Sequence, residues 1–456
     1  ANPQNSESVI LYSRMVVACR LMSPPHRADA QNMTYESLVI EEPTASVWTA
    51  APERQGETRT ITRQPILNAQ GRIQGCELLP GVHPRGAMPD DSEAVRTIID
   101  NLVLFGHDRL TRGSPAFIRC SLEALADRLF TVLPASLTVI EIPHSLPLSP
   151  KAIESCWNLR QSGYRLALVD CITDPQTHPL FDFVDYVKLD LICFDSATLQ
   201  KMRSRLAARS ATLIAENVQS REDYLQASAS GFHCFQGSFF APAEPLRYAK
   251  VPADRTVHIE ILKQLFLDPL DLKQLCPLVM RDPSLVCRLL RMVGSPVSVI
   301  RRRVDSVQEA ITYLGEDTFR RIAMLAIRCE RNAEQPPEIL HRALVRARFC
   351  ELASPLAKLN PREQYLLGLL SAMPLMLHVP MTALAGDFPL RQPVVEALLG
   401  AEGPERKLLD WVEALEQTQF AECYRIADIH KLDKDKLDRC YLEALTWETE
   451  RSNNPD

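Results

Sequence analysis

The chain of 456 residues has a formal net charge of −6 at pH 7, with 46% hydrophobic and 24% charged residues. This length is enough for two or three hydrophobic cores, and the composition is ordinary for a globular protein. The slightly negative charge argues against a general electrostatic grip on nucleic acid or anionic lipid, and no apolar run approaches the roughly 18 residues that span a bilayer. We therefore expect a cytoplasmic protein with neither a nucleic-acid nor a membrane partner.

The thirteen cysteines contain no Cys-x-x-Cys pair, and none lies at zinc-ligand spacing from a histidine. This pattern favours buried thiols in a reduced compartment.

Residues 1–57 are polar and lack a clean hydrophobic period, so we predict that they are largely disordered. Met33 is a candidate natural start, and residues 1–32 are then either sequence added upstream of it or a genuine tail.

From residue 58 to residue 246, short β-rich runs alternate with helical stretches. Candidate strands are Thr60–Leu67, Ile73–Leu79, Ala116–Cys120, Leu137–Ile142, Arg165–Asp170, Tyr186–Leu189, Thr212–Ala215 and His233–Gln236. Candidate helices include Ser92–Phe105, Ser149–Gly163, Ser196–Arg209 and Arg221–Gly231. Asn68–Gly71 is a hairpin signal, and the remaining βα units favour a parallel sheet. We predict a TIM-like (β/α)8 barrel with one antiparallel strand pair, and a doubly wound open sheet is the alternative.

After Pro245 the sequence shows helical periodicity and no convincing strand. Predicted helix starts use Asp268, Asp282, Ser306 and Asp317 as caps or first-turn acids, with Pro269 and Pro283 at first helical positions. Helix breaks are expected at residues 336–337 and 360–361. We predict a barrel domain over residues 58–246, a linker over 247–256, an all-helical domain over 257–450 and a tail over 451–456.

Short polar motifs end most of the predicted strands, where a barrel of this type carries its functional residues. They are Arg63–Ile66, Cys76–Leu79, Phe117–Ser121, Glu141–His144, Leu168–Asp170, Val187–Asp190, Ile214–Val218 and Gln236–Phe240. Their order and spacing over residues 58–246 resemble the EAL family of cyclic-di-GMP phosphodiesterases, whose name comes from a motif like Glu77–Leu79.

The resemblance implies a site in which two divalent metals activate a water for attack on a phosphodiester. Hard metals of this kind need several carboxylate or amide oxygens. The positions that match the family pattern are Glu77, Glu141, Asp170, Lys188, Glu216 and Gln236.

Four other positions depart from the family pattern. Arg119 replaces an asparagine ligand, Val169 replaces the aspartate that bridges the metals, and Gly81 replaces an arginine that clamps a phosphate. His144 replaces a glutamate that orders a nearby loop, in which Ile172 and Asp174 replace glycines. We therefore expect no metal cofactor and no phosphodiesterase activity, with Mg or Mn relevant only if residual activity exists.

Arg119 is the most disruptive of these changes. A guanidinium about 4 Å from a divalent ion costs on the order of 8 kcal/mol at an effective dielectric constant near 20. We hypothesise that Arg119 takes the structural place of the metal by pairing with Glu77 and Glu141. The alternative is that Arg119 points to solvent at the barrel mouth.

Several single residues have both a functional and a structural interpretation. Lys188 is either a remnant of catalysis or, as we favour, an ion-pair partner of Asp170 or Glu216. His144 is more simply a strand-end histidine than a metal ligand. The thiols of Cys76, Cys120 and Cys171 allow a redox role, although buried thiols are the simpler interpretation.

The helical half carries a second set of motifs, namely Leu275–Arg291, Val293–Ser295, Val304–Ile311 and Leu314–Arg321. Their succession resembles the HDOD domain, a relative of the metal-dependent HD phosphohydrolases that lacks the metal ligands. The match covers residues 259–327 and is looser afterwards, and Gly294 stands where asparagine is usual. None of the histidines after residue 256 precedes an aspartate, namely His258, His341, His378 and His430.

Later segments, Arg346–Glu351 and Tyr365–Ser371, resemble the arrangement found when an EAL-like domain is fused to an HDOD domain. The residues 301–303, three successive arginines, form either a patch for an acidic partner or a solvated loop. We predict a non-catalytic signalling adaptor with protein partners, acting in motility, biofilm or virulence control. The alternatives are a cyclic-di-GMP receptor that does not hydrolyse the nucleotide and a residual phosphodiesterase, and homodimerisation is open.

Overall fold

The computed structural model describes residues 58–81, 91–171, 178–190, 193, 196–207, 211–249, 255–267, 269–294, 303–329 and 337–453. The predicted disorder of residues 1–57, the loop positions Ile172 and Asp174, the cap Asp268 and the arginines 301 and 302 lie outside these residues.

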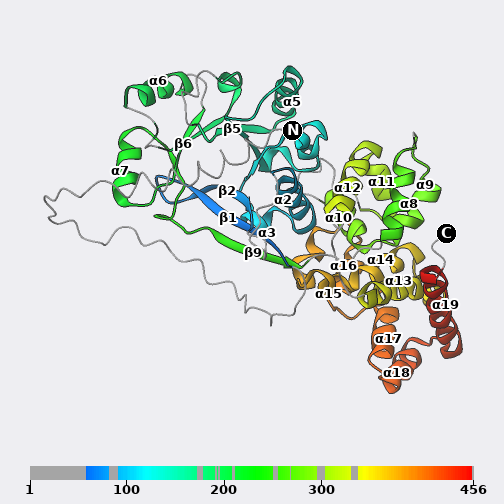
Figure 1. Cartoon of the computed structure of the whole chain (residues 1–456). Helices are drawn as coiled ribbons and strands as arrows, with labels where there is room; N and C mark the ends of the chain where they lie inside the picture. Colours follow the sequence, from blue (N-terminus) through cyan, green and yellow to red (C-terminus); the bar gives the residue numbers. More distant parts are fainter. Residues whose placement is uncertain are drawn as a thin grey trace, which may run out of the picture. The chain divides into compact units, whose positions relative to one another are not determined.

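The strands of the barrel half are β1 (Thr58–Asn68), β2 (Ile73–Pro80), β3 (Ala116–Arg119), β4 (Thr138–Pro143), β5 (Arg165–Val169), β6 (Tyr186–Asp190), β7 (Thr212–Glu216) and β8 (Cys234–Phe235). Strands β2 to β8 pair in sequence order, each pair parallel, and β1 closes the ring by pairing antiparallel with both β2 and β8 (Figure 1). The predicted barrel is confirmed, and the open sheet is excluded.

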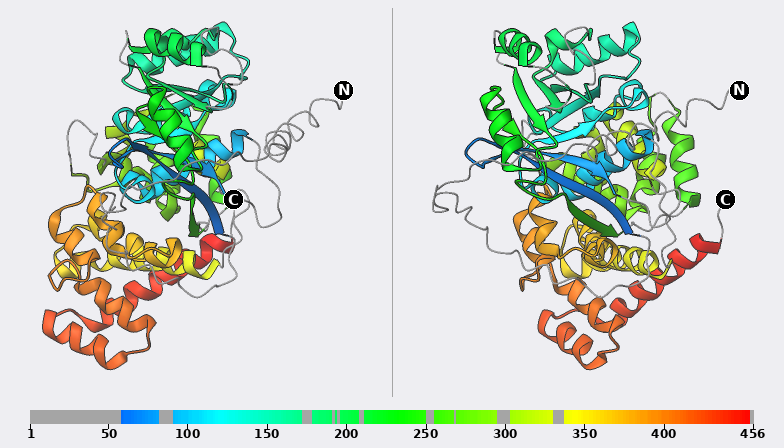
Figure 2. Two further views of the ribbon diagram at one scale, coloured as in Figure 1. Left: turned by 90° about the vertical axis from the view of Figure 1, so that its left-hand side faces the viewer. Right: turned by 60° about the vertical axis from the view of Figure 1, so that its left-hand side comes forward.

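A ninth strand, β9 (Glu244–Ala249), was not predicted from the sequence. It pairs antiparallel with residues Thr58–Arg63 of β1, and both views of Figure 2 show these blue and dark green strands side by side. The first helix of the helical half begins at Arg255. The structure therefore differs from the predicted linker over 247–256, because residues 247–249 belong to the sheet and residues 255–256 to a helix.

The helices of the barrel half are α2 (Asp91–Phe105), α3 (His107–Thr111), α4 (Leu122–Ala126), α5 (Pro150–Gln161), α6 (Ser196–Ala207) and α7 (Arg221–Ala229). Serine hydroxyls cap three of them: Ser121 caps α4, Ser149 caps α5, and Ser220 caps α7 in a capping box with Asp223. Each hydroxyl accepts a hydrogen bond from a first-turn N–H that the helix itself leaves unpaired.

Alternation along the strands separates the inside of the barrel from the outside. One small apolar cluster, here called the inner layer, gathers side chains from successive strands: Ile66, Phe117, Val139, Ala167, Val169, Ile214 and Cys234. Their neighbours in sequence, such as Ile118, Ile140 and Leu168, belong to the larger core that packs against the helices. Because side chains alternate across a strand, the residues two positions beyond the inner layer also point into the barrel.

The helices of the helical half are α8 (Arg255–Leu265), α9 (Leu272–Met280), α10 (Pro283–Gly294), α11 (Val307–Leu314), α12 (Glu316–Cys329), α13 (Pro337–Ala357), α14 (Pro361–Ser371), α15 (Met373–Leu377), α16 (Gln392–Leu398), α17 (Lys407–Glu416), α18 (Phe420–His430) and α19 (Lys434–Asn453). The predicted starts at Pro283 and Ser306 are confirmed, whereas α9 is capped by Asp271. Helix α19 extends into the predicted tail. Within the described residues no single helix is both long and apolar enough to cross a bilayer, although the bent pair Pro361–Leu377 and Met381–Asp387 passes that test jointly.

Candidate functional site

A single lysine lies at the centre of the barrel mouth. The fully buried Nζ atom of Lys188 in β6 lies 2.9 Å from Glu77 Oε2, 2.8 Å from Glu141 Oε1 and 3.1 Å from Glu216 Oε1. The glutamates come from β2, β4 and β7, so the sheet curvature brings together residues that are far apart in sequence. We call these four residues the lysine cluster.

Burial and mutual repulsion control the charges of the lysine cluster. Burial, followed by the charge of Glu77, raises the pKa of the Glu141 carboxyl to about 8. Burial also raises the pKa of Glu216. The Lys188 ammonium and hydrogen bonds from neighbours outweigh burial at Glu77 and lower its pKa. The three carboxylates raise the pKa of Lys188 despite its burial. At neutral pH the cluster therefore holds a charged lysine and keeps a proton on Glu141.

Gln236 extends the lysine cluster toward β1. Its amide nitrogen donates to Gln64 Oε1 at 3.0 Å and to the Glu77 carboxylate. The sequence analysis overlooked Gln64, although the alternation along β1 places it on the same face as Ile66 of the inner layer. Together these contacts fix the carboxylate of Glu77 from two sides, by a cation and by an amide.

The hypothesis that Arg119 pairs with Glu77 and Glu141 is wrong. Arg119 at the end of β3 forms its ion pair with Asp170, with Nη2 2.5 Å from Oδ2, and the two side chains are 36% and 45% exposed. Asp170 reaches this position because its backbone is left-handed, with φ 52°. The cation among the glutamates is Lys188. Its ion pair with Glu216 is one of the two predicted for this lysine, whereas Asp170, the other predicted partner, binds Arg119.

The donor set does not fit the two-metal site that the family pattern implies. Among the described residues, no group of three or more His, Cys, Asp or Glu side chains is arranged to hold a metal ion. The oxygens of the three glutamates are directed at the ammonium of Lys188. Val169, at the position of the bridging aspartate, is part of the apolar inner layer.

The motifs Ile214–Val218, at the end of β7, and Gln236–Phe240, at the end of β8, pack against each other. A side chain at Gly237 would place its Cβ 2.0 Å from the carbonyl oxygen of Val218, so only glycine fits there. The backbone N–H of Val218 donates to Gln236 O, and that of Phe239 donates to Val218 O. These bonds hold the ends of β7 and β8 together and so fix Glu216 relative to Gln236.

The remaining predicted residues surround this centre. Gly81 directly follows β2. His144 donates its backbone N–H to Val169 O, and its ring lies 5.3 Å from that of His178. Asn217, which the sequence analysis did not single out, donates to Asp190 at 2.9 Å. Cys76, Cys120 and Cys171 are buried as predicted, and burial raises the pKa of each thiol, which disfavours the reactive thiolate.

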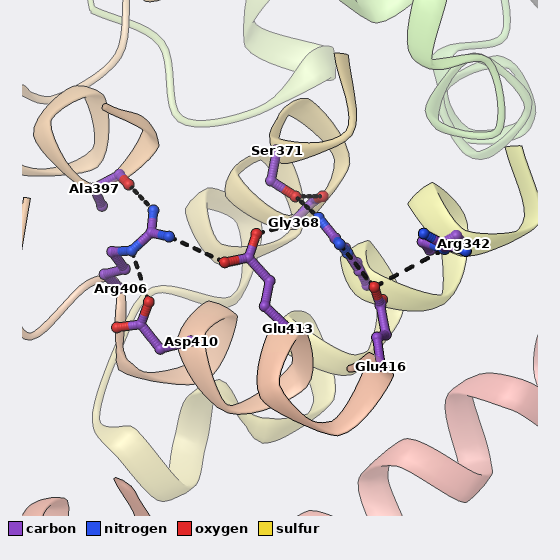
Figure 3. Close-up of polar contacts among 9 residues, drawn as sticks. Arg342, Gly368, Ser371, Ala397, Arg406, Asp410, Glu413 and Glu416 are labelled. Atoms are coloured by element: carbon purple, nitrogen blue, oxygen red, sulfur yellow. Dashed lines mark hydrogen bonds and ion pairs between the residues drawn. The ribbon is translucent and has the colours of Figure 1, made fainter. Parts of the chain in front are cut away.

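The helical half contains a polar network of its own. Arg346 of α13 binds both oxygens of Glu416, at 2.8 and 2.7 Å, and also Glu413 at 3.2 Å. Figure 3 shows Glu413 shared with Arg406, which in turn pairs with Asp410. Ion pairs of this geometry fix α17 on α13. The carboxylates of Asp410, Glu413 and Glu416 are bound by arginines and are therefore not free to bind a metal.

Another buried pair joins α8 to α10. His258 Nε2 lies 2.9 Å from Asp282 Oδ2, and the other oxygen of Asp282 accepts from the N–H of Leu285 in the first turn of α10. Asp282 is thus both a helix cap and a hydrogen-bond partner of His258. Gly294, at the other end of α10, lies so close to the backbone of Asp387 that a Cβ would meet its carbonyl oxygen at 1.9 Å. This contact accounts for the departure from asparagine.

The fold and the helical motifs agree with the comparisons with known proteins. The HDOD domain family matches residues 251–380, so the chain carries an HDOD domain, as predicted. The protein YuxH of Bacillus subtilis (strain 168) is 28% identical over 399 residues, covering 85% of this chain and 97% of YuxH. The cyclic di-GMP phosphodiesterase CdgJ of Vibrio cholerae is 29% identical over 398 residues, covering 86% of this chain and 92% of CdgJ.

Solved EAL structures match the barrel half. The EAL domain of Mycobacterium smegmatis DcpA has 16% identity and a TM-score of 0.34, covering 40% of this chain and 92% of that domain. A standalone EAL protein from Vibrio cholerae O395, solved in its c-di-GMP bound form, has 18% identity and a TM-score of 0.33, covering 42% and 94%. The protein is a barrel protein with a C-terminal HDOD domain. Over most of its length the chain is similar to YuxH and CdgJ.

Proposed function

We propose that this protein is a non-catalytic adaptor in cyclic-di-GMP signalling that acts through protein contacts of its barrel and its HDOD domain. The likeness to CdgJ supports the connection with cyclic-di-GMP. The observation that carries the non-catalytic part is the pair of departures at Arg119 and Val169: Arg119 binds Asp170, and Val169 lies in the apolar inner layer.

A metal-dependent reaction would require oxygen ligands that two positions of this chain no longer offer. Val169, at the position of the bridging aspartate, lies in the apolar inner layer and supplies no oxygen. Arg119 adds a cation at the rim, bound to Asp170, the family's remaining aspartate. This cation opposes metal binding, because like charges in a site of low dielectric repel strongly.

Residual phosphodiesterase activity is the rival function, and the likeness to CdgJ, a cyclic di-GMP phosphodiesterase, favours it. The decisive experiment incubates the full chain overnight with cyclic-di-GMP and Mg²⁺ or Mn²⁺ and measures linear dinucleotide. We expect none. Product that forms with the full chain and disappears with Glu77→Ala would overturn the non-catalytic proposal.

A variant in which two metal ligands are restored tests why the unmodified chain should form no product. Arg119→Asn combined with Val169→Asp restores two oxygen ligands of the family pattern while leaving the lysine cluster in place. Tightened metal binding by this variant, with the unmodified chain binding none, would show that these two positions disable the site. Equal metal binding by both chains would contradict that assignment.

Nucleotide binding without hydrolysis is a separate question. Titration calorimetry with cyclic-di-GMP, with and without Mg²⁺, distinguishes a receptor from an adaptor that responds only to proteins. For the adaptor we expect no heat of binding at nucleotide concentrations up to about 100 μM. This range would reveal a Kd of about 1 μM, which corresponds to a binding free energy of about −8 kcal/mol. Saturable heat would identify the chain as a cyclic-di-GMP receptor instead.

A further inference from the structure

Two helices of the barrel half contact the HDOD domain. Helix α2 leads from β2, which carries Glu77, to β3, and α4 begins three residues after Arg119, the last residue of β3. Both helices also contact the helical half: α2 lies against α10 and α12, as Figure 1 shows, and α12 lies against Leu129–Val132 just after α4.

A buried ion pair joins α2 to α10. Ser284, Arg288 and Arg291 lie on one face of α10 at the spacing i, i+4, i+7. Arg288 is fully buried and binds both carboxylate oxygens of Asp100 in α2, with Nε at 2.8 Å and Nη2 at 3.0 Å. A bidentate pair of this kind fixes both the distance and the orientation of the two helices.

The end of α2 is held in the same way. Arg291 donates to Phe105 O at 3.0 Å and also binds Asp387, next to the close approach at Gly294. Gly106 leaves room for this side chain, because a Cβ there would lie 2.6 Å from Arg291 Nη2.

Helix α4 is held by a third arginine of the helical half. Arg328 of α12 lies 3.1 Å from Glu123 and 2.9 Å from Asp127. Arg96 of α2 binds the same Glu123 at 2.6 Å. Glu123 thus joins α2, α4 and α12. Because α4 is capped by Ser121, two residues after Arg119, a shift of the β3 end moves the helix on which Arg328 acts.

We propose that α2 and α4 form a coupling element through which the HDOD domain reads the charge state of the barrel mouth, by way of Arg288–Asp100 and Arg328–Glu123. Apolar helix contacts can slide, whereas the buried bidentate pair Arg288–Asp100 has one arrangement, so displacement of α2 is passed on to α10 rather than absorbed. The inference rests on the proposed adaptor function and deepens it by naming the internal surface on which the HDOD domain receives the signal.

Hydrogen exchange of the full chain, measured by mass spectrometry, tests the coupling from both ends. Arg119→Ala is expected to speed amide exchange at least threefold in α4 and also in α10 and α12. Arg328→Ala is expected to speed exchange at least threefold in α4 and at the end of β3, because coupling between two sites is reciprocal. Acceleration confined to the half that carries the substitution would overturn the proposal.

Two control variants remove arginine ion pairs elsewhere. Arg160→Ala on α5 breaks a pair with Asp185 in the barrel, and Arg425→Ala on α18 breaks a pair with Glu422 in the helical half. Both should change exchange only around their own helix. Acceleration of α10 and α12 by Arg160→Ala, to the same extent as by Arg119→Ala, would show general loosening rather than a path.

Replacing both Asp100 and Arg288 by apolar residues tests whether this ion pair carries the coupling, without leaving one buried charge unpaired. Asp100→Leu with Arg288→Met keeps an apolar contact of similar volume, so the fold is expected to survive. In this background Arg119→Ala should no longer affect α10, and a persisting threefold effect there would contradict the role of the pair. These measurements use no nucleotide, so detection of hydrolysis would overturn the adaptor function and leave the coupling standing.

Discussion

The Nζ atom of Lys188 lies 2.8 Å from Oε1 of Glu141, and both side chains are buried at the mouth of the barrel. The two residues sit on strands β6 and β4, separated by β5, whose Val169 contributes no polar atom between them. The barrel thus holds a charged lysine among three glutamates at positions that match the family pattern. Several consequences can be measured.

Removal of the Lys188 charge should destabilise the fold. In Lys188→Met, Glu77, Glu141 and Glu216 lose their shared cation, and breaking a buried ion pair in this way costs about 3–5 kcal/mol. Chemical denaturation of the variant should show this loss of unfolding free energy. Lys151→Met on the exposed face of α5 is the matched control and should leave the midpoint unchanged. A Lys188→Met chain as stable as the original would show that the glutamates are solvated.

The lysine cluster should also make stability depend on pH. The pKa of Glu141 is raised to about 8, so the folded chain holds a proton that the unfolded chain has released above about pH 5. This stabilisation is complete below the ordinary carboxyl pKa and is lost as the pH rises through about 8. Glu216, whose pKa is also raised, acts in the same direction, whereas Glu77 acts only at lower pH.

Thermal unfolding of Glu141→Gln at several pH values tests this sign. We expect the fall in Tm between about pH 6 and pH 9 to become shallower in the variant, because glutamine does not titrate. A Tm of the unmodified chain that rises over this range would contradict the prediction.

The Arg119–Asp170 pair should contribute little to stability. Both side chains are about 40% exposed, 36% and 45%, so water and salt screen their attraction. Arg119→Ala should change the unfolding free energy by less than about 1 kcal/mol. A double-mutant cycle with Asp170→Ala measures the pair alone, and a coupling energy above about 2 kcal/mol would mean that the pair is buried in solution.

The asparagine usual at position 294 should not be tolerated in this chain. The Cβ of Gly294→Asn would meet the carbonyl oxygen of Asp387 at 1.9 Å, and overpacking of this kind costs about 1–3 kcal/mol or more. Gly386→Ala is the control, since nothing lies within 4 Å of its added Cβ. A stable Gly294→Asn chain would show that the segment around Asp387 can move away from α10.

The alternation of short β-rich runs with helical stretches made most of the barrel predictable. These runs located the strands, and the alternation of side chains along each strand places Glu77, Glu141, Lys188 and Glu216 on inward faces. The partner of Arg119 was not predictable in this way, because it depends on the left-handed turn of Asp170 after β5. Strand β9 was missed because its pairing with β1 is a long-range contact that no local pattern records. The pair Asp100–Arg288 was missed for the same reason.

The buried contacts of α10 and α12 bear on how the protein can be studied in pieces. A fragment that begins after residue 249 would lack Asp100, so Arg288, which is fully buried in the full chain, would meet solvent. Proteins captured by such a fragment would include ones attracted to an artificial cationic, apolar face. Bait for partner searches should therefore be the intact chain, with the coupled substitutions Asp100→Leu and Arg288→Met as its comparison.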